Sequence, residues 1–189
     1  MTLYIGVGGP KRVGKDTFSM GLNKELCAAK CTSVIERLAD PLYFMVEQLT
    51  GISSENLQDQ SKKEKIWTND TAPFPSLVGK CIRDLLLETG EDLRRRYGED
   101  VLARALKARE KSHKEYVIVT DVRTNPEALA MDIVFELQRA GVTYKGGKTE
   151  SGFTVPVHKI QLIDNPSDPL NSCCYSLIIE QIKGLKNKK

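Results

Sequence analysis

The stretch Gly8–Thr17, which reads GGPKRVGKDT, decides how this chain is interpreted. From Gly9 to Lys15 it follows the spacing G-x-x-x-x-G-K of a phosphate-binding loop, which normally ends in serine or threonine. Here Asp16 stands in that place, and a hydroxyl follows one residue later at Thr17. The stretch is therefore a phosphate-binding loop that has lost its function, a chance match to the pattern, or a variant of the loop with its own chemistry.

The sequence around the loop decides between these interpretations. The apolar run Leu3–Gly8 is short and bounded by glycines, which predicts a buried parallel strand. A helix is expected from Lys15 to about Lys30, because apolar residues recur there at helical spacing. A strand, a glycine-rich turn and a helix that begins at lysine form the context in which the pattern has meaning. We therefore interpret the stretch as a nucleotide-phosphate site rather than as a structural turn.

The residue types of the loop suit a bound phosphate. Glycines let the backbone curl so that its N–H groups point at phosphate oxygens, and the helix N-terminus adds partial positive charge. Lys15 is expected to bridge the β- and γ-phosphates of ATP. The expected ATP-binding residues are Gly9, Lys11, Arg12, Val13, Gly14, Lys15, Asp16 and Thr17.

Asp16 has two compatible interpretations. Magnesium takes oxygen ligands and keeps several waters, so Asp16 would hold Mg²⁺ directly or through water, while Thr17 reaches the α-phosphate. Both residues are candidate magnesium ligands. The other interpretation makes Asp16 an acid that is favourable at a helix start and nothing more.

A second acid is expected near the loop. The run Glu115–Val122 is continuous, apolar and ends in an acid, which predicts a strand with Asp121 at its carboxyl end, where ligands bind in such sheets. There Asp121 would orient the water shell of magnesium or assist the accepting oxygen. Arg123 follows, and Arg83 begins a helix; guanidinium forks suit phosphate. The alternatives are that Asp121 caps the helix that follows and that each arginine forms a surface ion pair.

The rest of the chain alternates strands and helices, which predicts an α/β fold with a central parallel sheet and helices on both faces. Further strands are expected at 33–39, at 153–164 and at the start of 174–186. Helices are expected at 40–52, 78–110 and 125–141, the second of them broken near Gly90 and Gly98. The polar segment at about 53–79 predicts a mobile insertion.

Composition narrows the class of protein. The 189 residues suit one domain, and a net charge of +3, partly from the terminal KGLKNKK, does not indicate a nucleic-acid partner. No apolar run approaches the length of a membrane span. Five cysteines, an odd number without metal-ligand spacing, indicate a reducing cytoplasm and no structural metal.

Four segments resemble the deoxynucleoside monophosphate kinases of bacteriophage and related viruses, which belong to the P-loop kinases. They are GPKRVGKDT, RLADPLYFMVEQLTGI, IRDLLLETGEDLRRRYGEDVLARAL and VIVTDVRTNPEA, in order from residue 5 to about 130. Gly-Lys-Asp-Thr is the usual loop ending in that family, so the resemblance makes Asp16 a variant and not damage.

The resemblance implies a single three-layer P-loop kinase domain over 1–189, with a short lid-like region at about 145–172. It implies Mg²⁺-dependent transfer of the ATP γ-phosphoryl group to a deoxynucleoside monophosphate, in the cytoplasm (the host cytoplasm if the chain is viral), by a homodimer. Lys15, Arg12, Asp121 and Arg123 would be catalytic. The residues implied for the acceptor site are Asp40, Arg83, Asp121 and Arg123.

The chain also departs from the family pattern. Tyr43 replaces a lysine, Leu102 replaces a tryptophan, and TNPE follows Asp-Val-Arg while keeping Glu127. The family brings arginines from a late lid, but no arginine follows Arg139. The cations left for that task are Lys145, Lys148 and Lys159, with Lys11 and Arg12 in the loop itself.

Two other functions stay open at this point. The animal form of phosphomevalonate kinase resembles the chain in length and in a basic loop that ends in Gly-Lys-Asp. A catalytically weak nucleotide-binding module fits the missing lid arginines, although Lys15, Thr17 and Asp121 are all present.

Overall fold

The computed structural model describes residues 2–109, 114–143, 152–162 and 172–186. The chain divides into two compact units, one made of Met1–Leu38 with Glu110–Lys189 and the other of Ala39–Arg109. The single domain, the mobile insertion and the lid-like region stay predictions. Lys145 and Lys148, which were candidates for lid cations, lie outside the described residues. Among the described helices, none is long and apolar enough to cross a membrane.

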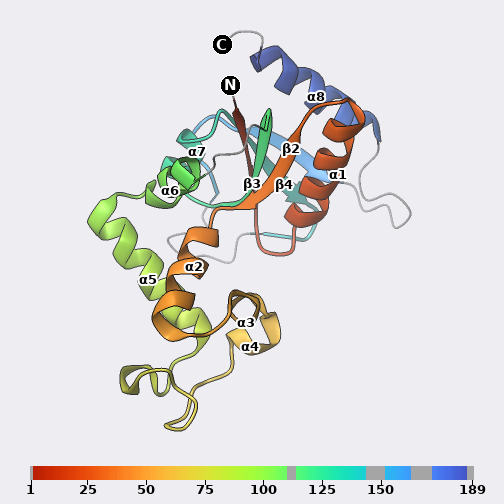
Figure 1. Ribbon diagram of the computed structural model, residues 1–189. Coiled ribbons are helices and arrows are strands. Elements are labelled where there is room, and N and C mark those ends of the chain that lie inside the picture. The colour runs from red at the N-terminus through yellow and green to blue at the C-terminus, as the bar shows by residue number, and fades with distance from the viewer. Residues whose placement is uncertain (1, 110–113, 144–151, 163–171, 187–189) are drawn as a thin grey trace. The chain divides into compact units, whose positions relative to one another are not determined.

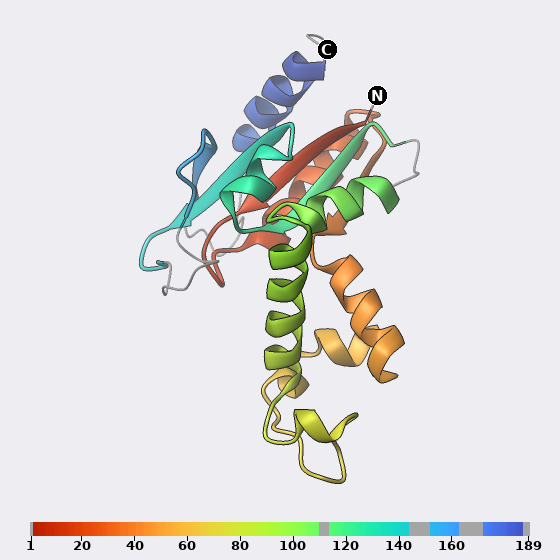
Figure 2. The same cartoon turned by 90° about the vertical axis from the view of Figure 1, so that its left-hand side faces the viewer.

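The first unit is built on a five-stranded sheet in which every neighbouring pair is parallel, in the order β2-β3-β1-β4-β5. Its strands are β1 (Leu3–Gly8), β2 (Ser33–Arg37), β3 (Tyr116–Val122), β4 (Ile133–Arg139) and β5 (His158–Leu162). Helices α1 (Lys15–Ala28) and α8 (Ser172–Lys186) lie on one face, and α7 (Asn125–Leu129) lies on the other (Figures 1 and 2). The predicted three-layer α/β fold with a central parallel sheet is therefore confirmed.

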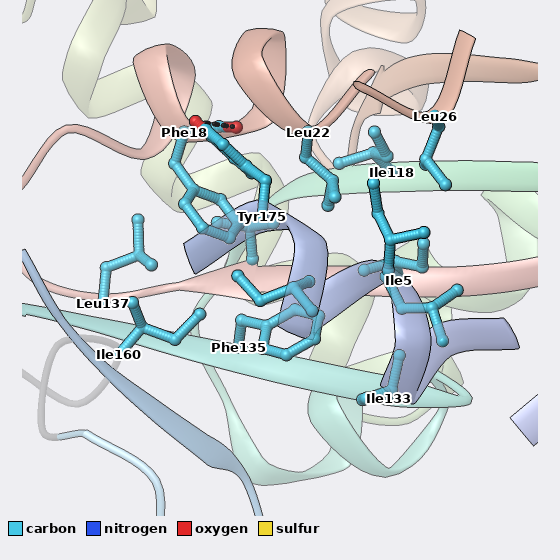
Figure 3. Packing of buried hydrophobic residues seen from close by; sticks show 14 of the residues in the cluster. Ile5, Phe18, Leu22, Leu26, Ile118, Ile133, Phe135, Leu137, Ile160 and Tyr175 are labelled. Atoms are coloured by element: carbon cyan, nitrogen blue, oxygen red, sulfur yellow. Dashed lines mark hydrogen bonds between the residues drawn. The ribbon is translucent and has the colours of Figure 1, made fainter. Parts of the chain in front are cut away.

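The main core lies between the sheet and the α1–α8 layer (Figure 3). Phe18 of α1 is fully buried, and its ring centroid lies 6.2 Å from that of Phe135 and 5.7 Å from that of Tyr175. The Tyr175 hydroxyl donates a hydrogen bond to the Phe18 carbonyl at 3.3 Å, so the buried phenol has a partner. This packing fixes the helix that follows the loop against the sheet.

On the opposite face, the second half of β1 carries Gly6 and Gly8 instead of large side chains. A Cβ at Gly6 would stand 3.0 Å from both Met131 and Val134 and 3.2 Å from Val122, so these side chains fill the space directly above the strand. Because side chains alternate along a strand, Gly8 faces the same side as Gly6. The α7 side of β1 is therefore closely approached at Gly6 and at Gly8.

Two predicted elements were wrong. Residues 125–141 do not form one helix, since α7 ends at Leu129 and β4 begins at Ile133. The continuous apolar run there fits a buried strand as well as a buried helix, and periodicity alone does not separate the two. The predicted strand at the start of 174–186 is instead part of α8, whose buried residues recur at helical spacing: Tyr175, Ile178, Ile179 and Ile182.

The second unit is helical. Its elements are α2 (Asp40–Thr50), α3 (Ser54–Gln58), α4 (Gln60–Lys63), the 3₁₀ helix η1 (Pro75–Leu77), α5 (Ile82–Tyr97) and α6 (Val101–Arg109). The predicted break near Gly90 was wrong, because α5 continues through it. A Cβ at Gly90 would stand 3.5 Å from Leu42 of α2, so the glycine serves close helix packing. The break near Gly98, where φ is +102°, is confirmed.

Candidate functional site: the loop after β1 and the end of β3

The loop between β1 and α1 winds tightly at the carboxyl edge of the sheet. Gly9, Arg12 and Gly14 have φ of +137°, +66° and +107°, in the region that favours glycine. A Cβ at Gly9 would stand 2.7 Å from the carbonyl oxygen of Leu137 in β4, so a larger residue does not fit there without a backbone shift. Val13 is fully buried and anchors the loop to the core.

Lys15 reaches back over this loop. Its ammonium group donates to the carbonyl oxygens of Gly9 at 2.9 Å and Pro10 at 3.0 Å, in a partly buried position. Gly14 is the N-cap of α1 and has no side chain to cap the helix, and the first-turn N–H groups of a helix point toward its N-terminal end. Loop, ammonium and helix start together present positive charge at one point, which is suitable for an anion.

Asp16 and Thr17 are exposed on the first turn of α1, next to that point. A carboxylate and a hydroxyl that both reach solvent fit Mg²⁺, which takes oxygen ligands and keeps part of its water shell. Lys11 and Arg12 are also exposed. The eight residues expected to bind ATP thus lie in the loop after β1 and in the first turn of α1.

Asp121 lies beside the start of the loop. The register between β1 and β3 runs from Gly6 opposite Val119 to Gly8 opposite Val122, so β3 carries one extra residue between these pairs. Asp121 takes a left-handed backbone with φ of +66°, which is uncommon for a residue with a side chain and most tolerable for Asp and Asn. The bulge brings Asp121 to the edge where β1 gives way to the loop.

Arg123 belongs to the same corner. Its guanidinium lies 3.9 Å from the Asp121 carboxylate, and the two side chains are 44% and 33% exposed. Both groups therefore remain accessible to a small molecule at the carboxyl end of the sheet. We name Asp121 and Arg123 together the strand-end pair.

Glu127 holds the backbone behind this pair. Its carboxylate is fully buried and accepts hydrogen bonds from the N–H groups of Arg123 at 3.0 Å and Thr124 at 3.1 Å. The Thr124 hydroxyl accepts the N–H of Glu127 at 3.3 Å, which completes a capping box for α7. The cap of α7 is thus formed by Thr124 and Glu127, and the alternative role of Asp121 as that cap is wrong.

Arg139 is a further candidate, which the sequence alone did not indicate. It ends β4, and its guanidinium nitrogen Nη2 lies 3.4 Å from the point where a Cβ on Gly14 would stand. Leu162 of β5 lies 3.6 Å from the same point. Arg139 therefore adds a cation at the end of the loop opposite to the strand-end pair. A helix predicted over residues 125–141 hid it, since only a strand ending at residue 139 delivers it to this edge.

Asp40 and Arg83 belong to the second unit, and their position relative to the loop stays a prediction. Asp40 begins α2. The Arg83 guanidinium lies 3.0 Å from the Glu64 carboxylate, with the side chains 37% and 70% exposed. Tyr43, which replaces the lysine of the family pattern, accepts a hydrogen bond from the Lys63 ammonium at 2.9 Å. A lysine thus stands close to that position in space, although not in the sequence.

Comparisons with known proteins add little information about the function of this chain. No family model matches the chain, and a comparison with curated proteins found no match. Among solved structures, an unliganded sugar kinase from a Janibacter species is similar, with 14% identity and a TM-score of 0.37, over 86% of this chain and 85% of that one. A likeness of this degree carries no argument about substrate or mechanism.

Proposed function

We propose that the chain transfers the γ-phosphoryl group of ATP to the phosphate of a deoxynucleoside 5′-monophosphate. One observation carries this proposal: Gly8, which leads into the loop, pairs with Val122, which separates the two residues of the strand-end pair. The loop with Lys15 and the acid–arginine pair thus adjoin at the carboxyl ends of neighbouring parallel strands, where ligands bind in open α/β sheets.

In this proposal an oxygen of the acceptor phosphate attacks the γ-phosphorus. The bond from that phosphorus to the oxygen bridging to the β-phosphorus breaks, and ADP leaves with the electron pair while the nucleoside diphosphate forms. Lys15 exchanges the carbonyls of Gly9 and Pro10 for oxygens of the β- and γ-phosphates. The loop N–H groups and Arg12 balance the remaining negative charge.

The remaining residues position the two substrates. Arg123 holds the acceptor phosphate with its guanidinium fork, with Asp121 beside it. The resemblance adds Asp40 and Arg83 to the residues expected to contact the acceptor. Asp16 and Thr17 would hold Mg²⁺, directly or through water, and the bound ion would supply positive charge to the phosphate oxygens. Arg139, at Gly14, takes part of the role that lid arginines have in related kinases.

A coupled assay tests the proposal. ATP and Mg²⁺ are supplied with dGMP, dTMP, dCMP, dAMP or phosphomevalonate, for the native chain, Lys15→Ala and Lys24→Ala. Lys24 is exposed further along α1 and serves as the matched control. We expect turnover of at least one deoxynucleotide, a loss of about 10²–10³-fold in kcat for Lys15→Ala, and none for Lys24→Ala.

The other outcomes are equally informative. Turnover of phosphomevalonate alone would mean that the acceptor is an aliphatic phosphate ester and not a deoxynucleotide. Binding of ATP with no transfer to any acceptor would make the chain a nucleotide-binding module and would overturn the proposal.

A further inference from the structure

A short segment, which we call the strap (residues 152–157), leads into β5 and covers the end of β1. The ring of Phe153 occupies the space above Gly8: a Cβ there would stand 2.4 Å from its Cε2 atom and 2.5 Å from its Cζ atom. At residue 8, nothing larger than the hydrogen atom of glycine fits beneath this ring. Gly8 therefore serves the seating of Phe153 as much as the curvature of the loop.

The strap is fastened at its other side to α7. The Asn125 side-chain amide donates to the Thr154 hydroxyl at 2.7 Å, and the Thr154 backbone N–H donates to the Asn125 side-chain carbonyl at 2.9 Å. Two reciprocal bonds define both the position and the orientation of the strap. Because Asn125 lies two residues after Arg123, the attachment adjoins the strand-end pair.

Phe153 is consequently held next to the proposed acceptor site. Its seat, Gly8, pairs with Val122, and the Val122 carbonyl oxygen lies 3.0 Å from the same Cβ point that the ring approaches. Asp121 and Arg123 are the chain neighbours of Val122. An aromatic ring, a guanidinium and a carboxylate thus adjoin at one edge of the sheet.

The ring is only half-buried, so part of its surface reaches solvent after it has packed on Gly8. Aromatic rings bind the π-faces and edges of other rings with modest dependence on which base is offered. A phosphate held by Arg123 and a ring against Phe153 are the two parts of a nucleotide. An aliphatic phosphate ester has no part that uses such a surface.

We propose that Phe153 is the base-contacting wall of the acceptor site. Building on the proposed function, this assigns the acceptor to the phosphate esters that carry a planar heteroaromatic base. Arg123 fixes the phosphate, and the exposed part of the Phe153 ring packs against the base. The Asn125–Thr154 attachment keeps the two contacts at a constant separation.

Binding measurements with matched ligands test this assignment. Isothermal titration of the full chain uses dGMP, dTMP, dCMP and dAMP, and 2-deoxyribose 5-phosphate as the ligand that keeps the phosphate and lacks the base. Phe153→Leu keeps an apolar side chain on Gly8, and Phe153→Tyr keeps the ring. Circular dichroism and thermal unfolding first check that both variants are folded.

We expect Phe153→Leu to weaken the preferred deoxynucleotide by about fivefold to 100-fold, and Phe153→Tyr to retain its affinity. The affinity for 2-deoxyribose 5-phosphate and for ATP should change by less than about twofold in both variants, because neither ligand uses the ring in this assignment. Equal losses for the nucleotide and for 2-deoxyribose 5-phosphate, or a loss confined to ATP, would overturn the assignment.

The experiment separates this assignment from the proposed reaction. Nucleotide binding that depends on Phe153 without any phosphoryl transfer would overturn the reaction and support the wall. Transfer to a deoxynucleotide that is indifferent to Phe153→Leu would support the reaction and overturn the wall. A native chain that binds none of the monophosphates would overturn both.

Discussion

The Asp121 carboxylate lies 3.9 Å from the Arg123 guanidinium, on a backbone that is left-handed at Asp121. Such backbone conformations cost free energy for residues with a side chain and persist where the surrounding structure determines them, often at functional sites. Here the bulge in β3 and the hydrogen bonds of Glu127 to Arg123 and Thr124 provide that constraint. The pair is therefore fixed from its backbone outward.

This arrangement allows charge and conformation to be separated at Asp121. Asp121→Asn keeps a side chain that tolerates the left-handed region, so the free energy of unfolding should stay within about 1 kcal/mol of the native value while phosphoryl transfer falls by at least about tenfold. Asp121→Val should lower the free energy of unfolding by about 1–3 kcal/mol, because a β-branched residue is strained there. Urea unfolding and the coupled assay measure the two quantities. Full transfer by Asp121→Asn would exclude a role for the charge.

The contact between Gly8 and Phe153 predicts a coupled pair of substitutions. Gly8→Ala places a methyl group in the Phe153 ring and should lower the free energy of unfolding by about 1–3 kcal/mol. In a Phe153→Ala background the same change should cost clearly less, with a coupling free energy of about 0.5–3 kcal/mol. Urea unfolding of the four chains in this cycle gives the value.

A matched control exists in α8. A Cβ at Gly184 meets nothing within 4 Å, so Gly184→Ala should raise the free energy of unfolding by about 0.5–1 kcal/mol as a helix substitution does. If Gly8→Ala cost the same with and without Phe153, the strap would not be seated on β1 in solution.

Arg139 predicts an effect on ATP rather than on the acceptor. Because its guanidinium lies at Gly14, Arg139→Ala should raise the KM for ATP by about tenfold to 100-fold, as expected for loss of a charge-assisted hydrogen bond. Arg139→Lys keeps the charge but not the forked guanidinium, so its KM for ATP should lie between those of the native chain and Arg139→Ala. The KM of the acceptor should stay unchanged. A rise in the acceptor KM instead would place Arg139 in the other half of the site.

How far the sequence predicts this structure depends on whether a feature is local. The strand, loop and helix from Leu3 to Ala28 were predictable because glycines, a lysine and helical spacing all lie within one stretch. The strand ending at Asp121 was predictable for the same reason. Its left-handed backbone was not, since it follows from the register between β1 and β3.

Two missed features, the positions of Arg139 and Phe153, depend on contacts between distant segments. Arg139 reaches Gly14 only because residues 133–139 form a strand, and an apolar run of that length suits a buried helix equally well. Phe153 lies in a segment predicted as a strand, and nothing in its sequence indicates that Gly8 lies beneath the ring. The α8 helix was predictable, because its apolar residues recur at helical spacing that the strand interpretation ignored.

The ion pair between Glu115 and Lys186 predicts how stability depends on pH. The Lys186 ammonium donates to the Glu115 carboxylate, which lowers the pKa of Glu115, and the backbone N–H of Thr32 lowers it further. The same hydrogen bond raises the pKa of Lys186. The pair joins the end of α8 to the start of β3, so its charge state acts on the attachment of the last helix to the sheet.

The directions of these two pKa shifts define the pH range in which the ion pair stabilises the fold. A carboxylate with a lowered pKa stabilises the fold above its unfolded pKa of about 4.3, and this contribution is lost as the pH falls through the lower folded value. A lysine with a raised pKa stabilises the fold below its unfolded pKa of about 10.4, and this contribution is lost as the pH rises through the higher folded value. The pair should therefore stabilise the chain between these limits.

Glu115→Gln tests this pH range. Glu180→Gln is the control, since Glu180 is exposed on α8, the helix that carries Lys186. Urea midpoints of Glu115→Gln should lie below the native midpoint near pH 7 and converge with it as the pH falls through the lowered folded pKa of Glu115, where the native carboxylate becomes protonated as well. Glu180→Gln should follow the native chain throughout this range. A difference for Glu115→Gln that persists undiminished at low pH would mean that residue 115 acts through packing, because a lost charge interaction must vanish when both chains are neutral at that position.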